Sequence, residues 1–323
     1  MMHAFRPNHG RTARILVYAV LMLAIAAWEF LPRLNKSGNE FDVQTWNMEW
    51  FPSGDIYPQP EADEAERINT TARIMRRQGV PDIFFAQEIR DPATCQSLVA
   101  RLNAPDFKMA VCSSFYTYGE EEPSPQQVAI FTRFEIIEVD SQPWSAADFV
   151  YPPRGYVYAL LRINGELVAC FNVHLKSNFI TKEEDERKQA TLNRLKRELA
   201  SQQLMSKVNE LRNKGHKGEA IKSFIIAGDF NTSLTDARFE SESTVRDILA
   251  DGFKDACEGL TGDAYATLPA NSYYPAARFD FILHSGLQQS GKPFVFTKNA
   301  MSDHRSMRVM FKTPNKEEGN WDN

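Results

Sequence analysis

The sequence predicts a layered α/β protein. Short apolar or alternating runs, typical of strands, recur along the chain, and several are apolar enough to be covered on both faces. Helical patterns lie between some of them, and this mixed order favours sheets packed in the middle with helices outside. The expected strands are 41–46, 82–86, 107–112, 128–131, 156–163, 167–173, 223–227, 279–283 and 307–311.

Two helices are expected between these strands. The clearer one starts at Thr181, where T-K-E-E forms a capping box with Glu184, and it ends at Gly215. The other covers 62–78 and stops before Gly79 and Pro81. The first helix keeps apolar residues at roughly helical spacing, namely Leu192, Leu195, Leu199, Val208 and Leu211.

The domain organisation is simple. With 323 residues, 43% of them hydrophobic and 24% charged, the composition is that of an ordinary globular protein. No internal repeat or second linker interrupts the sequence after about residue 39. We therefore expect one domain over 40–313, followed by a polar tail over 314–323.

The N-terminus resembles a targeting segment. Arg6, Arg11 and Arg14 precede an apolar run over 15–28. This run has 14 residues, whereas an ideal membrane-spanning helix needs ~20. A signal peptide removed near Ala24-Ile25-Ala26, an uncleaved membrane anchor and a buried core helix remain open. The first two alternatives assign residues 1–36 to export and predict an extracytoplasmic domain, either periplasmic or secreted, or held at the inner membrane by a single N-terminal helix.

The charge of the expected domain is acidic. The chain has 37 basic and 42 acidic residues, and residues 1–36 contain five of the former and one of the latter, which leaves 32 against 41 and a net charge of −9. A sequence-blind nucleic-acid binder usually has a basic face. A nucleic-acid substrate would therefore depend on a local patch and on metal ions.

The cysteines do not indicate a metal site. Cys95, Cys112, Cys170 and Cys257 show no C-x-x-C spacing, which argues against a zinc or thioredoxin-type site. An exported domain could form disulfides, with 95 and 112 the pair nearest in sequence, but buried free thiols are equally compatible.

Polar residues at strand ends form the candidate site, because α/β proteins place their sites where strands end and loops begin. Any one of them alone is more often a turn or cap residue, so the prediction depends on the set. Its members are Asn47, Glu88, His174, Asp229, Asn231, Asp280, Asp303 and His304.

The residue types in this set indicate phosphoester hydrolysis. Carboxylates, amides and imidazoles without a cysteine suit Mg²⁺ or Mn²⁺, and also Ca²⁺, better than zinc. A histidine beside an aspartate supplies a base near neutral pH. Together they predict attack of an activated water at phosphorus.

Six motifs carry a specific resemblance. T-W-N-M-E-W, F-A-Q-E-I-R-D, N-V-H-L-K-S, I-A-G-D-F-N-T, R-F-D-F-I-L and M-S-D-H resemble, in order and rough spacing, those of the endonuclease/exonuclease/phosphatase superfamily, which includes deoxyribonuclease I. The resemblance covers nearly all of 41–311. Within the superfamily, the chain resembles the bacterial exported or membrane-anchored members. It implies a four-layer α/β/β/α sandwich of two mixed sheets packed face to face.

The resemblance also implies roles for the residues. Glu88 resembles the principal metal ligand, with Asn47 and Asp303 nearby. Asp229 and Asn231 resemble the pair that orients the attacking water and contacts the phosphate. His304 resembles the general base, Asp280 its carboxylate partner, and His174 the second histidine that binds phosphate or protonates the leaving oxygen.

Three further features concern the substrate. Arg90 and Lys176 are candidate phosphate contacts, although Arg90 could equally form a surface ion pair with Asp91. Deoxyribonuclease I has a glutamate where Gln126 and Gln127 stand here, so its leaving-group protonation is in doubt for this chain. The basic residues over 181–218 fit an ordinary solvated helix better than a nucleic-acid patch, because acidic residues are interspersed.

The function expected first is a metal-dependent nuclease acting on DNA or another nucleic acid outside the cytoplasm, as a monomer, with a membrane contact if residues 1–36 stay attached. A phosphatase or phospholipid phosphodiesterase at the membrane is the alternative. A catalytically inactive binding module is a third, disfavoured because the polar set is intact.

Overall fold

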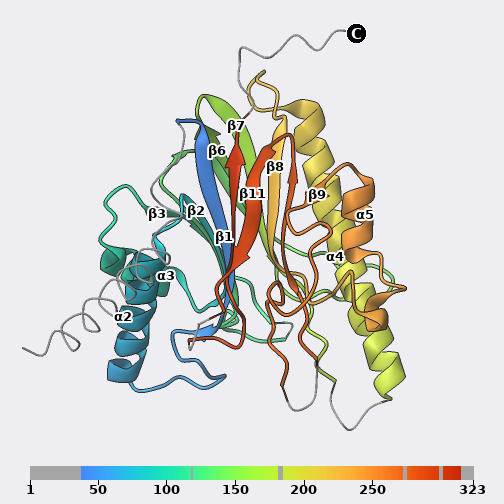
Figure 1. Cartoon of the computed structure of the whole chain (residues 1–323). Helices are drawn as coiled ribbons and strands as arrows, with labels where there is room; N and C mark the ends of the chain where they lie inside the picture. The colour runs from blue at the N-terminus through green and yellow to red at the C-terminus, as the bar shows by residue number, and fades with distance from the viewer. Residues whose placement is uncertain (1–37, 118, 181–184, 272–274, 298–300, 314–323) are drawn as a thin grey trace, which may run out of the picture.

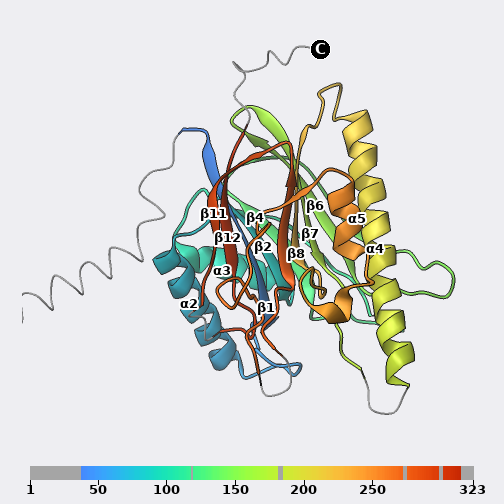
Figure 2. The same ribbon diagram turned by 45° about the vertical axis from the view of Figure 1, so that its right-hand side comes forward.

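The computed structural model describes residues 38–117, 119–180, 185–271, 275–297 and 301–313. Within them two six-stranded sheets lie face to face in the middle of the molecule, as Figure 1 shows. Helices α2 (Glu61–Gln78) and α3 (Pro92–Leu102) cover one outer face. Helices α4 (Glu186–Lys214) and α5 (Thr244–Ala250) cover the other, as seen in Figure 2. The predicted α/β/β/α sandwich is confirmed.

The first sheet has the strand order β11-β12-β1-β2-β4-β3, and the second has the order β5-β6-β7-β8-β10-β9. The strands of the first sheet are β1 (Glu40–Phe51), β2 (Ile83–Ile89), β3 (Lys108–Cys112), β4 (Gln127–Thr132), β11 (Gln288–Val295) and β12 (Met307–Lys312). Those of the second are β5 (Glu135–Pro143), β6 (Gly155–Ile163), β7 (Glu166–His174), β8 (Ser223–Asp229), β9 (Lys254–Asp255) and β10 (Asp280–Ser285).

Each sheet contains one central parallel pair, β1 with β2 and β7 with β8. The carboxyl ends of these four strands meet at one end of the sandwich, the lower end in Figure 1, which we call the site end. Strand β1 starts at the opposite end. The arrangement brings the residues that follow four separate strands into one place.

The interface between the sheets is mainly apolar, and two buried amides lie in it next to the site end. Gln87 Nε2 donates to Asn172 Oδ1 at 2.7 Å, and Asn172 Nδ2 donates to the carbonyls of Ala86 and Ala129 at 2.8 Å each. Both side chains are fully buried. Because a buried amide must be hydrogen-bonded, these contacts favour one alignment of the two sheets next to the site end.

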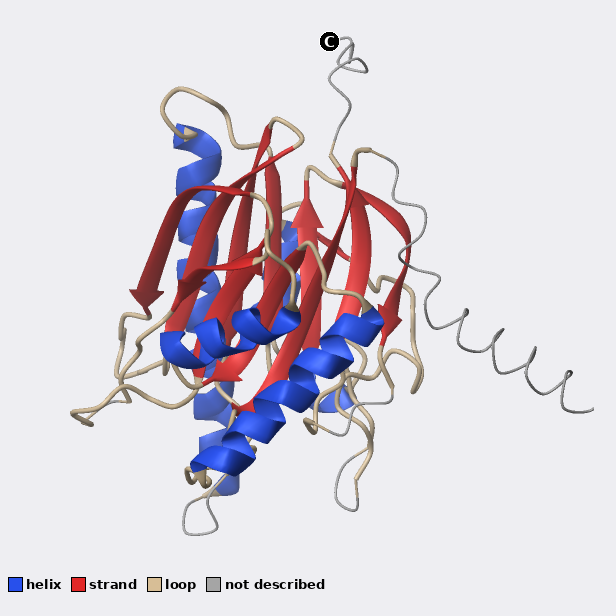
Figure 3. Cartoon of the chain, turned by 90° about the vertical axis from the view of Figure 1, so that its left-hand side faces the viewer, coloured by secondary structure: helices blue, strands red, loops and turns tan. Residues whose placement is uncertain are grey.

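Helix α2 confirms the sequence prediction to within one residue. Helix α3 was not predicted, although its start has a clear signal: Asp91 caps it by accepting from Thr94 N at 2.7 Å, and Pro92 occupies its first turn. Figure 3 shows both helices crossing the outer face of the first sheet.

Helix α4 corrects the sequence prediction in two respects. It begins at Glu186 with Asp185 as the cap, and the expected capping box over 181–184 lies outside the described residues. Its early buried face consists of Asn193 and Arg197, whereas Leu192 and Leu195 are each 39% exposed. The apolar spacing predicted the wrong buried face for this part of α4, because the charged Arg197 is buried as part of an ion pair.

All nine expected strands are present, and three were missed. Strands β5 and β11 are edge strands with mixed polar sequences, β11 containing Gly291 and Pro293, and β9 has two residues. Edge strands bury less surface and therefore leave a weak hydrophobic pattern.

The predictions for the N-terminal segment, the C-terminal tail and the cysteines compare with the structure as follows. The segment 1–36 and the tail 314–323 lie outside the described residues. Among the helices that are described, none has the length and apolarity required to cross a membrane. The four cysteines are free thiols, with Cys95, Cys170 and Cys257 buried.

Candidate active site

Strand β1 supplies Asn47 through an irregular end. Its pairing with β2 shifts register between Asn47 and Phe51, a bulge that redirects side chains. Glu49 and Trp50 next to it have left-handed backbones, with φ of 50° and 48°. Asn47 is 2% exposed, and its Nδ2 donates to Glu88 Oε1 at 3.1 Å and to Asp229 Oδ2 at 2.9 Å. Asn47 therefore joins the two sheets.

Glu88 lies at the end of β2 with φ of 57°. Left-handed conformations cost free energy for residues with a side chain, and they concentrate at functional sites. The other carboxylate oxygen of Glu88, Oε2, accepts from Trp50 N at 3.0 Å. The side chain is 12% exposed, so the carboxylate is partly accessible to solvent.

Asp229 ends β8 and is 1% exposed. Gly228 before it is required, because φ is 140° and a Cβ would lie 2.0 Å from the Val173 carbonyl oxygen. Asp229 Oδ1 accepts from Asn231 N at 2.9 Å, and Asn231 Nδ2 donates to Leu175 O at 3.2 Å. The predicted Asp229 and Asn231 pair thus forms one hydrogen-bonded turn.

Asp280 and His304 form a buried pair. His304 Nδ1 lies 2.7 Å from Asp280 Oδ2, and His304 Nε2 lies 3.9 Å from Asp229 Oδ2. Strand pairing places Asp280 directly opposite Asp229. The loop of His304 is tied to β1, because Ser302 Oγ donates to Asn47 O at 2.7 Å and Trp46 Nε1 donates to His304 O at 3.1 Å.

The electrostatics of this group follow from its burial. Burial alone would lower the pKa of His304, but the carboxylates of Asp280 and Asp229 outweigh it and raise the pKa well above the usual value. Burial raises the pKa of Asp229 to about 7, against the opposing influence of His304. His304 and Asp229 therefore hold protons more tightly than isolated side chains do.

His174 ends β7, 3.7 Å from Glu88 Oε1 and 3.6 Å from Asp229 Oδ2 through its Nε2. Among the described residues no group bonds to its Nδ1. Burial, and then the nearby Arg154, lower the pKa of His174 well below its usual value. A neutral His174 fits contact with a phosphate better than donation of a proton to a leaving group.

His174 has glutamines, Gln126 and Gln127, where deoxyribonuclease I has a supporting glutamate, and the structure shows what these residues contact instead. Arg154 occupies this region, with Nε donating to His174 O at 2.9 Å, Nη2 to Leu175 O at 2.8 Å and Nη1 to Gln126 Oε1 at 2.9 Å. Gln127 faces elsewhere and accepts from Ser113 Oγ at 2.6 Å. These contacts therefore argue further against protonation of the leaving group by His174.

Asp303 is exposed at the edge of the cleft, and its N–H donates to Glu49 Oε2 at 3.2 Å. Glu49 was overlooked in the sequence, although it stands two residues after Asn47 in T-W-N-M-E-W. Burial, and then the carboxylates of Asp303 and Glu88, raise the pKa of Glu49. Three carboxylates are thus close enough to interact, against the ion pair of Glu49 with Arg67 at 3.8 Å.

This proximity of carboxylates fits a divalent ion. Glu49, Glu88 and Asp303 with the amide of Asn47 make an oxygen-donor set of the kind that Mg²⁺ or Mn²⁺ takes. Asp229, Asp280 and His304 also have ligand atoms within 4.8 Å of one another. Since His304 Nδ1 and Asp280 already satisfy each other, we assign that trio to proton handling and the first set to the metal.

The two predicted substrate contacts differ in their surroundings. Arg90 Nη1 contacts both carboxylate oxygens of Glu64 at 2.8 Å, and Arg90 Nε contacts Asp91 at 3.3 Å, so the guanidinium is occupied. Lys176 follows β7 beside the site and bonds only locally, to Ser177, among its described contacts. Burial, and then Arg154, lower the pKa of Lys176 to about 8.

The comparisons with known proteins agree with this geometry. A model of the Endonuclease/Exonuclease/phosphatase family matches residues 45–304, a range that contains every residue of the predicted site from Asn47 to His304. The chain belongs to this family. Members of the endonuclease/exonuclease/phosphatase family are divalent-metal-dependent phosphoesterases, and the chain is accordingly a metal-dependent hydrolase of phosphoesters. No curated protein gives a significant sequence match to the chain.

Solved structures show the same fold at low identity. TDP2 from C. elegans is 21% identical with a TM-score of 0.57, covering 87% of this chain and 77% of that one. A family protein from Bacteroides thetaiotaomicron is 18% identical with a TM-score of 0.58, covering 85% and 95%. The mannosyl-6-phosphatase Bt3783 of the same organism is 19% identical with a TM-score of 0.56, covering 84% and 99%.

Proposed function

We propose that this protein is a Mg²⁺- or Mn²⁺-dependent nuclease that hydrolyses phosphodiester bonds of nucleic acid outside the cytoplasm. The observation that carries the proposal is the meeting of His304, Asp229, His174 and Glu88 within 4 Å of their neighbours at the site end. The first sheet supplies the proposed metal-binding residues and, through the loop before β12, His304. The second sheet supplies Asp229, Asp280 and His174 for the proton and the phosphate.

The mechanism follows from the atoms that face the cleft. Asp280 bonds His304 Nδ1 and leaves Nε2 directed at Asp229, so a water held against Asp229 would give its proton to Nε2 of a neutral His304. The pKa of His304 is raised in the metal-free protein, and the positive charge of a bound divalent ion would favour the neutral imidazole. Asn231 and His174 hold the phosphate oxygens. Glu88, Asn47, Glu49 and Asp303 would hold a divalent ion, which would supply charge neutralisation and polarisation of a phosphoryl oxygen.

Exposed aromatic side chains support nucleic acid over a small phosphoester. Tyr57, Phe149 and Phe179 lie in loops at the site end and are 69%, 90% and 72% exposed. Bases stack on such rings, at about 1–3 kcal/mol per base. With Lys176 near the cleft, they give an acidic domain a local means of holding a single strand.

The export part of the proposal rests on Arg6, Arg11 and Arg14 before the apolar run 15–28. Strand β1 enters at the end opposite the site, and Glu40 and Asn47 are separated by about 23 Å of extended chain. A short tether to a membrane would therefore direct the site toward soluble substrates. Fractionation of the producing cells and mass spectrometry of the mature N-terminus test location and cleavage together.

Activity of the purified protein with Mg²⁺ tests the reaction class. The substrates are plasmid DNA, single-stranded DNA, bis-p-nitrophenyl phosphate, p-nitrophenyl phosphate and phosphatidylcholine vesicles. Cleavage of DNA that is lost in His304→Ala and kept in the matched His216→Ala supports the proposal. Turnover of the monoester alone would favour a phosphatase, a second candidate suggested by the name of the mannosyl-6-phosphatase, and no turnover with any metal would favour an inactive module.

The aromatic contribution has its own test. Phe149→Ala with Phe179→Ala should weaken binding of single-stranded DNA about 10-fold or more and leave turnover of bis-p-nitrophenyl phosphate unchanged. A matched control is Phe294→Ala, which removes an exposed ring on β11. Equal loss on both substrates would show that the rings shape the site instead of holding bases.

A further inference from the structure

A buried ion pair joins α4 to the segment before α5. Arg197 Nη2 lies 2.6 Å from Glu242 Oε2, and Arg197 Nε donates to Glu242 Oε1 at 2.8 Å, which makes a bidentate contact. Both side chains are 2% exposed. Glu242 Oε1 also accepts from Thr244 Oγ1 at 2.7 Å. In the sequence Arg197 is one of many charged residues on a solvated helix, and nothing there distinguishes it.

The other side of the same guanidinium faces the site. Arg197 Nη1 donates to Lys176 O and to Asn178 Oδ1, at 3.0 Å each. Asn178 Nδ2 donates to Asn231 O at 2.7 Å. Asn231 in turn bonds Asp229, so a continuous set of hydrogen bonds runs from Glu242 to the centre of the site.

The end of this path is a residue that needs support. Asn231 has a left-handed backbone with φ of 52°, a conformation that is uncommon outside glycine and is held by its surroundings. Its carbonyl is fixed by Asn178, its side chain by Leu175 O, and its N–H by Asp229. Release of Asn178 would remove one of these three restraints.

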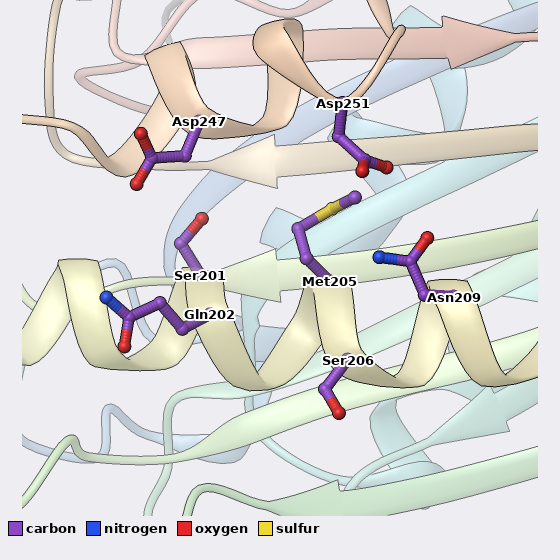
Figure 4. A pocket seen from close by; sticks show the side chains of 7 residues that line it. All are labelled: Ser201, Gln202, Met205, Ser206, Asn209, Asp247 and Asp251. Carbon is purple, nitrogen blue, oxygen red and sulfur yellow. The ribbon is translucent and has the colours of Figure 1, made fainter.

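The helices do not depend on the ion pair to stay together. Leu204, Val208, Val245 and Ile248 belong to one buried apolar cluster between α4, α5 and the second sheet. Ser201 Oγ, one turn after Arg197, donates to Thr244 O at 2.7 Å. The α4 and α5 surfaces also border the pocket shown in Figure 4, which is lined by Ser201, Met205 and Asp251 among others.

A buried ion pair adds little net stability relative to well-packed apolar residues, because desolvation offsets the attraction. We propose that Arg197, held by Glu242, is a positioning residue that fixes the loop from Leu175 to Asn178 and thereby Asn231 and Lys176 for contact with the phosphate. The inference rests on the proposed function for its activity readout. A misplacement of about 1 Å in such groups costs about 100-fold in rate.

The test compares two ion pairs that both join α4 to the α5 region. In the test variant, Arg197→Met and Glu242→Leu replace the buried pair by apolar side chains. In the matched control, Arg212→Met and Asp251→Leu replace the pair at the other end of the interface, which lies 2.7 Å apart and is about one third exposed. We expect kcat on bis-p-nitrophenyl phosphate to fall about 100-fold in the test variant and by less than about 2-fold in the control.

Two further variants separate positioning from stability. Arg197→Lys keeps the charge but lacks the fork that reaches Glu242 and Asn178 together, so kcat should fall with the melting temperature retained. Asn178→Ala should lower kcat by itself and add little in the Arg197→Met background, because both act on one path. The half-saturating Mg²⁺ concentration should stay within about 3-fold in all of them.

A fall in kcat that merely follows the melting temperature in test and control alike would overturn the inference, as would unchanged kcat in a folded test variant. Should the wild type be inactive, amide hydrogen exchange decides independently. Faster exchange at Leu175, Asn178 and Asn231 in the test variant but not in the control supports positioning, and equal exchange in both overturns it.

Discussion

The two halves of the site differ in their contact with water. The proposed metal half consists of Asn47, Glu49, Glu88 and Asp303 and comes from the β1 and β2 ends and the loop before β12. Its carboxylates are partly exposed to solvent. The imidazole half consists of His174, Asp229, Asp280 and His304, and all four are buried. An ion that arrives hydrated needs an accessible set of oxygens, whereas strong pKa shifts need exclusion of water.

His304 shows how the two halves are joined. Its loop leads into β12 of the first sheet, yet its ring bonds Asp280 of the second sheet. Asn47 makes the reverse connection, from β1 to Asp229. The halves therefore differ in their chemistry and do not correspond to the two sheets. The role of each half can be tested by a substitution that leaves the other half intact.

The largest effect is expected in the imidazole half. His304→Ala should lower kcat by about 10²- to 10⁴-fold, because the general base is lost. The half-saturating Mg²⁺ concentration should change little, as measured by initial rates across a metal titration. His216→Ala is the control, since His216 pairs with Glu138 away from the cluster. A large rise in the Mg²⁺ requirement of His304→Ala would break the proposed division.

The metal half should respond in the opposite way. Glu88→Ala should raise the half-saturating Mg²⁺ concentration by about 100-fold and abolish activity at ordinary Mg²⁺, with little loss of melting temperature because a ligand at a strand end buries little apolar area. Glu210→Ala on the surface of α4 serves as the control. Full rescue by a few-fold increase in Mg²⁺ would contradict the ligand assignment.

The third prediction concerns protons in the imidazole half of the metal-free protein. Asp280→Asn should lower the pKa of His304, because the nearest carboxylate raises it. In the wild type, protonated His304 stabilises the fold fully below the unfolded pKa of ~6.5, and this stabilisation is lost as pH rises through the higher folded value. NMR titration of the imidazole and melting temperatures against pH measure both effects. An unchanged His304 titration in Asp280→Asn would show that Asp229, and not Asp280, raises the pKa of His304.

The smallest effect is expected at the rim of the metal half. Arg90→Ala should change KM for DNA by less than about 3-fold, because its guanidinium is paired with Glu64 and Asp91 and is therefore occupied. Lys176→Ala should raise KM more, since its ammonium makes only local bonds to Ser177. Steady-state kinetics on one DNA substrate compare the KM values of the two variants. A larger rise in KM for Arg90→Ala than for Lys176→Ala would show that Arg90 contacts the phosphate.

The candidate residues were predictable because each ends, begins, closely follows or closely precedes an apolar strand. Asn47, Glu88, His174 and Asp229 stand at strand ends that hydrophobic patterns identify. Glu49 could have been found as a second acid within the same motif. Arg154 and Arg197 could not, because arginines within loops and amphipathic helices are usually solvated, and their burial depends on partners as distant in sequence as Gln126 and Glu242.

The sequence by itself determined the nine principal strands, helix α2 and the set of polar residues that ends those strands, because periodicity and turn residues are local properties. Only the tertiary structure decided the edge strands, the buried face of α4 and the partners of each site residue. Those depend on contacts between segments far apart in the chain, such as Gln87 with Asn172 and Arg197 with Glu242. A one-dimensional pattern shows which residues prefer burial, but the pairing of buried charges is set only when the sheets and helices pack.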